Sequence, residues 1–511
     1  MKNIKGKLKT ILLKPQSIAS GTISLMVFTI LSKLLGFVRE MILAANFGTS
    51  WRLDALVVAM DPAINLGSMV ASAIASMTIP IYISEKAKDE EARKRYVTQI
   101  LFISSLLLVV FGIILCLFPE TLIKIFAPHF GQRELEYAVR KMRILGLLPL
   151  IQGFNALVSA FFRAEKRYLL ISVTQLFFNF TAIPVILIFS PILSESSYLL
   201  CFIAGTLVMN IINFIIIKPS IKLKYLRGSF RNPKIKETLK LAFPLIFSGS
   251  LSLIYNIIDK AFASSLQEGS IISLRFAQTI NSMITSVLIG SFLTTLFTEF
   301  SEIHERKDMS ALEIRLKKSC RDILNFTIPF TAWLIIMAHP LITLLLERGN
   351  FTSESTTLVS GAFIGYTISF TIGPVNLLIS RLFEATKKTR VLLFISIINV
   401  LLNVLFNSLL IGPLGITGLA LSSSLIVFIQ FFMTLILEKK YFNLKFFDKG
   451  VLLKNLSITT LLFFLSFYLQ GKMNATLWLI LTNIVFLSLF VFLNRQILKS
   501  LKKRLFSRVG K

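Results

Sequence analysis

The sequence predicts an all-α polytopic membrane protein with about fourteen transmembrane helices. The helices form two six-helix lobes in a pseudo-twofold repeat, followed by a C-terminal helix pair. The 511 residues are 54% hydrophobic and include 46 phenylalanines, with a mean hydropathy of +0.75. Apolar runs of about 20 residues, long enough to cross a bilayer, recur along the chain. The Lys and Arg residues lie in short clusters between those runs, which is typical of cytoplasmic loops.

Each expected helix is an apolar run bounded by charged or turn residues. The expected spans are 22–46, 54–82, 97–118, 139–162, 169–190, 197–217, 238–264, 270–297, 323–346, 355–378, 390–411, 415–437, 453–470 and 475–494. The expected domains are a basic cytoplasmic segment at 1–21, an N-terminal lobe at 22–217, a cytoplasmic linker at 218–240, a C-terminal lobe at 238–437, a helix pair at 453–494 and a basic cytoplasmic tail at 495–511.

The basic residues predict how the helices are oriented. With the N-terminus in the cytoplasm, 43 of the 55 Lys and Arg residues fall in cytoplasmic segments, and only five fall in loops on the other side. This asymmetry indicates an even number of helices with both termini in the cytoplasm. The net charge of +29 is therefore a topogenic signal, and we expect no nucleic acid partner.

The chain also contains an internal repeat. The motif FRAEKR at 162–167 recurs as FEATKK at 383–388, an offset of 221 residues, and each copy precedes a similar apolar run. At nearly the same offset, the charged pair at 39–40 corresponds to the pair at 259–260. Two parallel six-helix halves with a central cavity are a transporter architecture, and the helix pair at 453–494 has no counterpart in the repeat.

Charged residues inside the apolar runs indicate a polar cavity, because an ionisable side chain at bilayer depth needs a partner or water. The stretch 32–80 carries several such charges on two apolar helices. Arg140, Lys141 and Arg143 lie at the outer end of the fourth span, where interfacial anchoring is the simpler interpretation. The three cysteines and three histidines are scattered without metal-ligand spacing, so we expect no enzyme, metal site or bound cofactor.

Several motifs together resemble one family. SKLLGFVRE, FGTSWRLDA and LLLERGNFTSESTTLVSGAFIGYTI, followed by SRLFEATKKTR and GITGLALSSSL, are similar to the MurJ/MviN family of lipid II flippases. That family belongs to the multidrug, oligosaccharidyl-lipid and polysaccharide exporter superfamily, and the resemblance covers nearly the whole chain. It implies a cationic cavity that opens to either face in turn, and a groove beside the last two helices for a polyprenyl tail. It also implies a protein of the bacterial inner membrane that binds lipid II; we expect a monomer in contact with membrane lipids.

The resemblance transfers site residues to the first two helices. The family has two arginines and an acid in its first helix, where this chain has Lys33, Arg39 and Glu40. Asp54 stands at the acidic position of the family after the Phe-Gly turn. Two structural alternatives stay open, because Lys33 could pair with Glu40 or extend to the interface, and Asp54 could cap the second helix.

The second helix departs from the family pattern. Where the family usually has Arg-Arg and Glu-Gly, this chain has Leu66, Gly67, Ala71 and Ser72. Arg275, one turn before the Asp-Arg position of the family in the eighth helix, is expected to supply the missing cation. Asp61 has no place in the family pattern. The expected substrate-binding residues are Lys33, Arg39, Glu40, Asp54, Asp61 and Arg275.

A second group of residues suggests ion coupling. Asp259 in the seventh helix, Asn399 and Asn403 on one face of the eleventh, and Ser423 in the twelfth could bind Na⁺, or Asp259 could carry a proton. Alternatively, Asp259 pairs with a nearby cation and the asparagines bond across helices, in which case the membrane potential alone could act on the cavity charges.

The sequence therefore predicts a flippase that moves lipid II from the cytoplasmic to the periplasmic leaflet by alternating access. An exporter of another undecaprenyl-pyrophosphate-linked oligosaccharide is the main alternative, because of the departures in the second helix. A cation-coupled drug antiporter would not need the extra helix pair. A membrane scaffold for cell-wall enzymes without transport activity would keep its function when Arg39 and Arg275 are neutralised.

Overall fold

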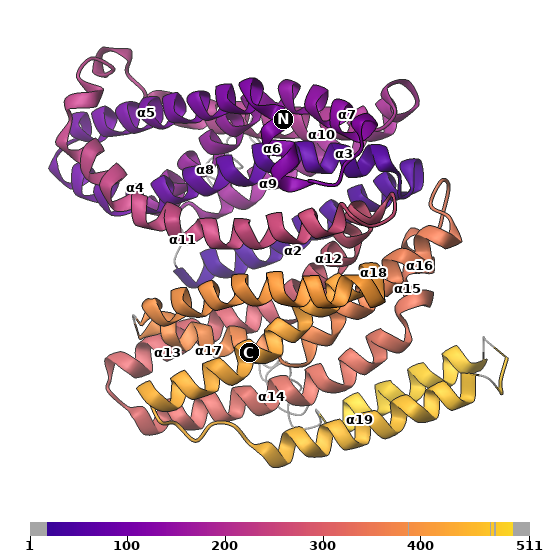
Figure 1. Cartoon of the computed structure of the whole chain (residues 1–511). Coiled ribbons are helices and arrows are strands. Elements are labelled where there is room, and N and C mark those ends of the chain that lie inside the picture. The colour runs from indigo at the N-terminus through magenta and orange to yellow at the C-terminus, as the bar shows by residue number, and fades with distance from the viewer. Residues whose placement is uncertain (1–17, 387, 471, 475–476, 494–511) are drawn as a thin grey trace, which may run out of the picture. The chain divides into compact units, whose positions relative to one another are not determined.

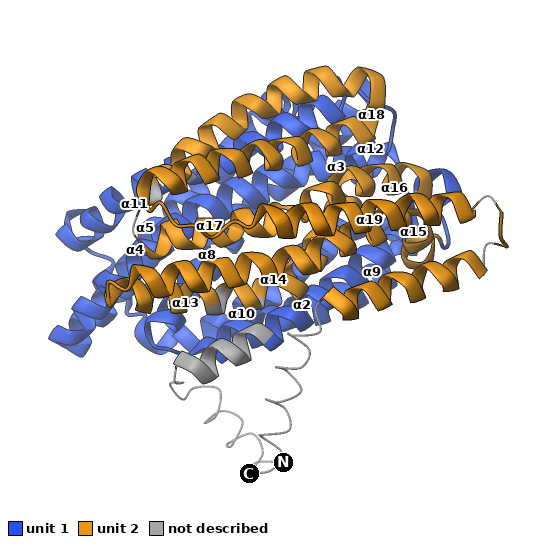
Figure 2. Ribbon diagram, turned by 90° about the horizontal axis from the view of Figure 1, so that it is seen from below, with its two compact units in different colours: residues 1–272, 348–355 blue, residues 273–347, 356–511 orange. Residues whose placement is uncertain are grey.

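The computed structural model describes residues 18–386, 388–470, 472–474 and 477–493, and these residues are helical or in connecting loops. The basic tail expected at 495–511 and most of the segment expected at 1–21 lie outside the described residues. The chain forms two compact units, one of residues 1–272 with 348–355 and one of residues 273–347 with 356–511 (Figure 2).

Unit 1 is a helical bundle that contains the first seven expected spans (Figure 1). Its helices are α2 (Ile18–Phe47), α3 (Trp51–Asp61), α4 (Gly67–Lys88), α5 (Glu90–Leu117), α6 (Pro119–Phe126), α7 (Gln132–Ile144), α8 (Leu148–Ala164), α9 (Tyr168–Leu193), α10 (Ser196–Ile217) and α11 (Pro233–Ala263). A π-helical turn, η1 (Pro62–Leu66), joins α3 to α4, and a 3-10 turn, η2 (Leu145–Leu147), joins α7 to α8. Three further 3-10 turns precede α11: η3 (Lys218–Ser220), η4 (Leu223–Tyr225) and η5 (Ser229–Arg231).

Side-chain caps fix where several of these helices begin. Ser50 accepts a hydrogen bond from the backbone of Leu53 at the start of α3, and Asp89 does the same for Ala92 at the start of α5. Asn232 caps α11, whose first residue is Pro233. Each cap satisfies an N–H group that has no partner within its own helix.

The core of unit 1 lies where α4 packs alongside α5, α8 and α11 (Figure 1). The rings of Tyr82 and Phe161 are 5.3 Å apart in this core, and the hydroxyls of Tyr96 and Thr238 lie 2.9 Å apart. The seventh expected span therefore packs within unit 1. The two predicted lobes were defined by the internal repeat, whereas the two units are defined by how compactly the chain packs. The division into lobes therefore stays a prediction.

Unit 2 contains the remaining spans. Its helices are α12 (Ser270–Thr285), which begins in unit 1, α13 (Ser291–Glu305), α14 (Met309–Ile336), α15 (Ala338–Leu346), α16 (Ser353–Thr367), which also begins in unit 1, α17 (Gly373–Ala385), α18 (Thr389–Tyr441), α19 (Lys449–Gln470) and a final apolar helix, Leu477–Leu493. A π-helical turn, η6 (Ser286–Gly290), joins α12 to α13, and a 3-10 turn, η7 (Ile368–Thr371), precedes α17.

Three of the spans in unit 2 are bent or interrupted. The axes of α14 and α15 differ by 69°, and the helices on either side of Ile372 differ by 49°. The long helix α18 covers two expected spans and is interrupted at Gly415, where φ is 54° and ψ is −131°. The core of this unit packs α13, α14 and α17 around buried residues such as Leu316 and Phe383.

The two π-helical turns lie about one repeat length apart in the chain. η1 follows Asp61 and η6 follows Thr285, so each turn lies within the second expected span of its predicted repeat half. A π-helical turn widens the helix by one residue and disturbs its hydrogen-bond ladder, and such turns are frequent at functional sites. Periodicity did not reveal either turn.

The positions of the expected helices are confirmed, because each expected span coincides with a helix or a bent helix pair. The expected number of spans is not confirmed. Within the described residues, eight helices are long and apolar enough to cross a membrane, or up to ten if each bent pair is one span. The chain is therefore an all-α, multi-pass membrane protein.

Candidate functional site

Arg39 is enclosed by aromatic rings inside unit 1. Its guanidinium lies 5.4 Å, 5.9 Å and 5.8 Å from the ring centres of Phe178, Tyr198 and Phe202. It donates to the Glu40 carboxylate at 2.8 Å, and the Tyr198 hydroxyl donates to the same carboxylate oxygen at 3.2 Å. The positive charge is thus balanced by a carboxylate and by three π-faces in a largely dry environment.

The other two predicted cations lie in different units. Lys33, on the same helix as Arg39, has an exposed side chain. Arg275 is half-buried on α12 in the part of the helix that belongs to unit 2. Their role in binding a substrate stays a prediction.

Asp54 is buried and binds the start of α12 rather than the start of its own helix. Its Oδ2 accepts a hydrogen bond from the backbone N–H of Gly269 and its Oδ1 accepts one from Ile272, both at 2.7 Å. Ser50 caps α3 itself, so Asp54 is a cap supplied from a distant part of the chain. A carboxylate at a helix N-terminus is favoured by the helix dipole as well as by the two hydrogen bonds.

Asp61 forms an ion pair with Lys260, a residue near the C-terminal end of α11. The Asp61 side chain is 9% exposed and that of Lys260 is 21% exposed. Asp61 is the acid that has no place in the family pattern, and this contact gives it a partner.

Three segments of unit 1 meet where Asp54 binds, and we call them the loop junction: residues 45–49, 264–272 and 348–355. Asn350 donates its backbone N–H to the carbonyl of Ala45 at 2.8 Å and its side-chain amide to Asn46 at 2.5 Å. The hydroxyls of Thr49 and Ser355 lie 2.7 Å apart. The segment 348–355 is therefore fastened to the turn between α2 and α3 by hydrogen bonds.

Two glycines allow the backbones at the loop junction to approach this closely. Gly48 and Gly349 have φ values of 59° and 60°. A Cβ atom on Gly48 would lie 2.4 Å from the carbonyl oxygen of Asn350, and one on Gly349 would lie 2.3 Å from that of Ala45. Neither position can accept a larger residue without displacing the backbone.

Polar contacts from the start of α7 extend the loop junction. Arg133 donates to Glu268 at 2.6 Å and lies 4.2 Å from the ring centre of Trp51. The backbone N–H of His129 donates to the hydroxyl of Ser264 at 3.3 Å. The segment 264–272 is thus held from two sides.

The residues predicted for ion coupling are distributed over both units. Asp259 is half-buried in unit 1, whereas Asn399, Asn403 and Ser423 belong to unit 2. Asn399 donates to the side chain of Gln430 at 3.0 Å, and Asn403 is fully buried. These contacts agree with the alternative of bonding between helices, and ion coupling stays a prediction.

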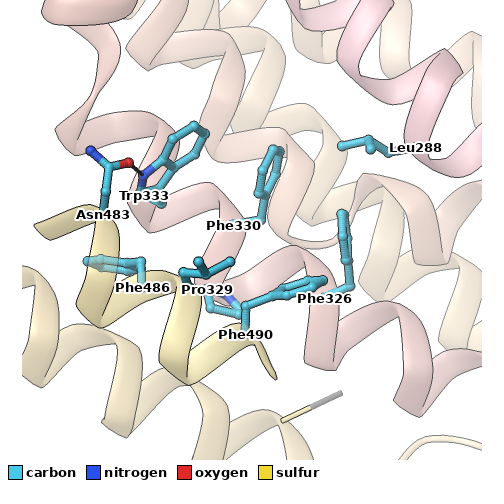
Figure 3. Close-up of a pocket in the computed structure, with 9 residues that line it drawn as sticks. Leu288, Phe326, Pro329, Phe330, Trp333, Asn483, Phe486 and Phe490 are labelled. Carbon is cyan, nitrogen blue, oxygen red and sulfur yellow. Dashed lines mark hydrogen bonds between the residues drawn. The ribbon is translucent and has the colours of Figure 1, made fainter. Parts of the chain in front are cut away.

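An aromatic pocket of about 370 Å³ lies between α14 and the final helix of unit 2 (Figure 3). Phe326 stacks on Phe330 and meets Phe490 edge to face, with ring centres 5.3 Å apart in both cases. The indole N–H of Trp333 donates to the amide oxygen of Asn483 at 3.0 Å, which is the hydrogen bond drawn in Figure 3. The remaining lining is apolar: Leu288, Pro329, Phe486 and Leu487.

Sequence reasoning missed three features of these sites. Lys260 was recognised as a charge at a helix end but not as the partner of Asp61. The junction contacts of Asn350 were also missed. The aromatic pocket was the third feature missed. The sequence does indicate it, because Phe326, Phe330 and Trp333 are spaced so that they lie on one face of a helix.

Comparisons with known proteins agree on one family. The sequence model of the lipid II flippase MurJ family matches residues 43–490. A probable lipid II flippase MurJ of Buchnera aphidicola subsp. Schizaphis graminum is 26% identical over 465 residues, which are 89% of this chain and 90% of the relative. The lipid II flippase MurJ of Thermosipho africanus is 26% identical over 495 residues, covering 96% of this chain and 98% of the relative.

Two solved structures show the same fold. One is a lipid II flippase MurJ in an inward closed conformation, with a TM-score of 0.79 and 23% identity over 94% of this chain and 99% of the other. The other is an inward-facing multidrug resistance MATE family transporter of the MOP superfamily, with a TM-score of 0.69 and 13% identity over 81% of this chain and 94% of the other. Because the family model spans most of the sequence, the chain belongs to the lipid II flippase MurJ family.

Proposed function

We propose that this chain is a flippase that moves lipid II from the cytoplasmic to the periplasmic leaflet of a bacterial cytoplasmic membrane, for cell-wall synthesis. The observation that carries the proposal is the family match over residues 43–490, with relatives named as lipid II flippases along nearly their full length. The protein acts as a monomer with both termini in the cytoplasm. It moves its substrate without making or breaking covalent bonds, so it is a transporter and not an enzyme.

Cationic side chains in the helices bind the pyrophosphate of the substrate. Lipid II joins a polyprenyl tail to a disaccharide-pentapeptide through a pyrophosphate, and this head group cannot cross hydrocarbon unaided. Lys33 and Arg39 in unit 1 and Arg275 in unit 2 are the cations that compensate its charge. Arg39 is paired with Glu40 in the structure, so it must exchange that carboxylate for phosphate oxygens when substrate enters.

The aromatic pocket binds the polyprenyl tail of the substrate. Its lining is almost entirely apolar, and it lies against the final helix, which belongs to the pair without a counterpart in the repeat. An isoprenoid chain binds such a surface through contact with apolar and aromatic side chains. We assign to this pocket the tail-binding groove that the family resemblance implies beside the helix pair at 453–494.

The loop junction serves as one of two gates in alternating access. It is made of loops that the distribution of Lys and Arg places outside the cytoplasm. Its hydrogen bonds and glycine contacts keep the periplasmic end closed, with Asp54 as the buried member. Passage of the head group requires these contacts to break and re-form.

The energy for transport has two candidate sources. Na⁺ or a proton could act at Asp259, together with Asn399, Asn403 and Ser423, or the membrane potential could act on the cavity cations. Removing external Na⁺, and in a separate assay collapsing the pH gradient, each at constant potential, distinguishes ion coupling from the potential.

A second candidate substrate is another undecaprenyl-pyrophosphate-linked oligosaccharide for a surface polysaccharide. The observation that favours it is the replacement of the usual charges in the second helix by Leu66, Gly67, Ala71 and Ser72. The two substrates share the pyrophosphate and tail and differ in the glycan.

Complementation of a conditional lipid II flippase knockout tests the proposal. We expect wild type to restore growth, and Arg275→Ala to abolish it at equal membrane levels. Arg140→Ala serves as the matched control because it removes an arginine from a predicted interfacial anchor. Failure of well-expressed wild type to restore growth would favour the other glycan.

A further inference from the structure

Two carboxylates on α3 bind the same part of the chain in different ways. Asp54 and Asp61 are seven residues apart, which places them on one face of the helix with about 10 Å of rise between them. Asp54 accepts backbone hydrogen bonds from Gly269 and Ile272. Asp61 instead pairs with the ammonium of Lys260. Only the second contact neutralises a full positive charge.

The position of Lys260 makes this pairing informative. Lys260 is three residues before the end of α11 at Ala263, where a lysine side chain can usually extend to the interface and stay hydrated. Here it lies against a buried acid, with 21% of its side chain exposed. A buried ion pair is weak evidence for a gain in stability, because desolvation of both charges offsets their attraction. The pair therefore suggests a role other than stability.

The sequence that follows Asp61, residues 62–80, contains no lysine or arginine. The positions that carry arginines in the resembling family are Leu66 and Gly67, five and six residues after Asp61. Arg39 is enclosed by Glu40 and aromatic rings. Lys260 belongs to α11, and its ion pair with Asp61 brings a positive charge to the C-terminal end of α3.

We propose that Lys260 binds the pyrophosphate of the lipid-linked substrate and that Asp61 is the counter-ion that holds Lys260 while the site is empty. This inference rests on the proposed function and adds a binding residue to it. Substrate entry exchanges one anionic partner of the ammonium for another, so that Lys260 is not left buried without a counter-charge. The Asp61 carboxylate then repels the bound phosphate, which lowers affinity and favours release.

Binding to the full-length protein in lipid nanodiscs tests this role. The probes are lipid II, undecaprenyl pyrophosphate and undecaprenol, which lacks phosphate. The variants are K260M, K260R, D61N and the double variant D61N/K260M, which removes both charges and leaves neither partner buried alone. The control is E85Q/K88M, which removes a partly buried ion pair of 2.5 Å at the end of α4.

Because K260M and D61N/K260M lack the ammonium, both variants should bind lipid II and undecaprenyl pyrophosphate about tenfold or more weakly than wild type. Their affinity for undecaprenol should be unchanged. K260R should restore most of the affinity because it keeps the charge. D61N should bind the pyrophosphate lipids more tightly than wild type. The control pair should bind all three probes like wild type.

Two results would overturn the inference in distinguishable ways. If D61N/K260M is as stable as wild type and binds lipid II with the same affinity, the ion pair is structural and Lys260 is not a binding residue. If wild type binds neither lipid II nor undecaprenyl pyrophosphate, the proposed function itself fails, and the role of Lys260 fails with it.

Discussion

Asp54→Asn should open the loop junction. The carboxylate gives one oxygen to the N–H of Gly269 and the other to the N–H of Ile272. An asparagine keeps one acceptor but turns an NH₂ group toward the second N–H, and it removes the negative charge from the start of α12. Hydrogen bonds to a charged acceptor are worth about 1.5–3 kcal/mol each, so the loss should be about 2–4 kcal/mol. That loss would shift the closed–open equilibrium by roughly 30- to 1000-fold.

A disulfide reporter measures this shift. The hydroxyls of Thr49 and Ser355 lie 2.7 Å apart, so T49C/S355C can form a disulfide when the loop junction is closed. The reporter needs a background in which the three free cysteines are replaced by alanine: Cys116, Cys201 and Cys320. We expect D54N to lower the rate of disulfide formation in membranes by at least tenfold.

Glu268→Gln is the matched control for this experiment. It removes a carboxylate from the same junction, but its partner Arg133 is exposed, and exposed ion pairs contribute about 0–1 kcal/mol. We expect less than about a fivefold change in the disulfide rate. If D54N cross-links at the wild-type rate, Asp54 does not hold the junction closed and our reasoning about it is wrong.

Three further predictions concern the loop junction, the aromatic pocket and Glu165. Gly349→Ala should also slow disulfide formation in the same reporter, because its Cβ would lie 2.3 Å from a backbone oxygen; a wild-type rate would show that the close approach is not required. Phe330→Asp should weaken undecaprenol binding by at least about tenfold while Phe330→Leu keeps it, and equal binding by both would exclude the aromatic pocket as the tail site. Burial raises the pKa of Glu165, but hydrogen bonds from Tyr82 and Lys86 outweigh it and hold the pKa below its ordinary value. The stability that Glu165 contributes is therefore present above the pKa of the unfolded chain and lost as pH falls through the lower folded pKa, so Glu165→Gln should flatten thermal stability between about pH 6 and 3. An unchanged pH profile would contradict this.

The helix positions could be predicted from the sequence because the length of apolar runs and the placement of Lys and Arg are local properties. The resemblance added the family, and the comparisons confirmed it. The two spans expected at 390–411 and 415–437 lie in α18 on either side of Gly415, whose backbone is not helical. The same local reasoning gave no sign of the π-helical turn that follows Asp61.

The partners of the site residues could not be predicted, because they depend on how distant segments pack. Asp61 and Lys260 are about two hundred residues apart, and neither lies in a motif that points to the other. Asp54 was expected to bind substrate, to cap its own helix, or to do both; it caps α12 rather than its own helix, and its binding role stays a prediction. Arg39 was expected to bind substrate, which stays a prediction, and the sequence did not indicate the three aromatic rings that surround its guanidinium.

Transport of lipid II by the purified protein is the most direct test of the central claim. Proteoliposomes would carry lipid II in the inner leaflet, and its arrival outside would be followed by an impermeant enzyme that modifies only exposed head groups. We predict that wild-type protein makes nearly all of the lipid II accessible, and that protein-free liposomes and Arg275→Ala protein do not. If well-folded wild-type protein leaves lipid II inaccessible but moves another undecaprenyl-pyrophosphate-linked oligosaccharide, the protein is a flippase for a different glycan and our assignment of lipid II is wrong.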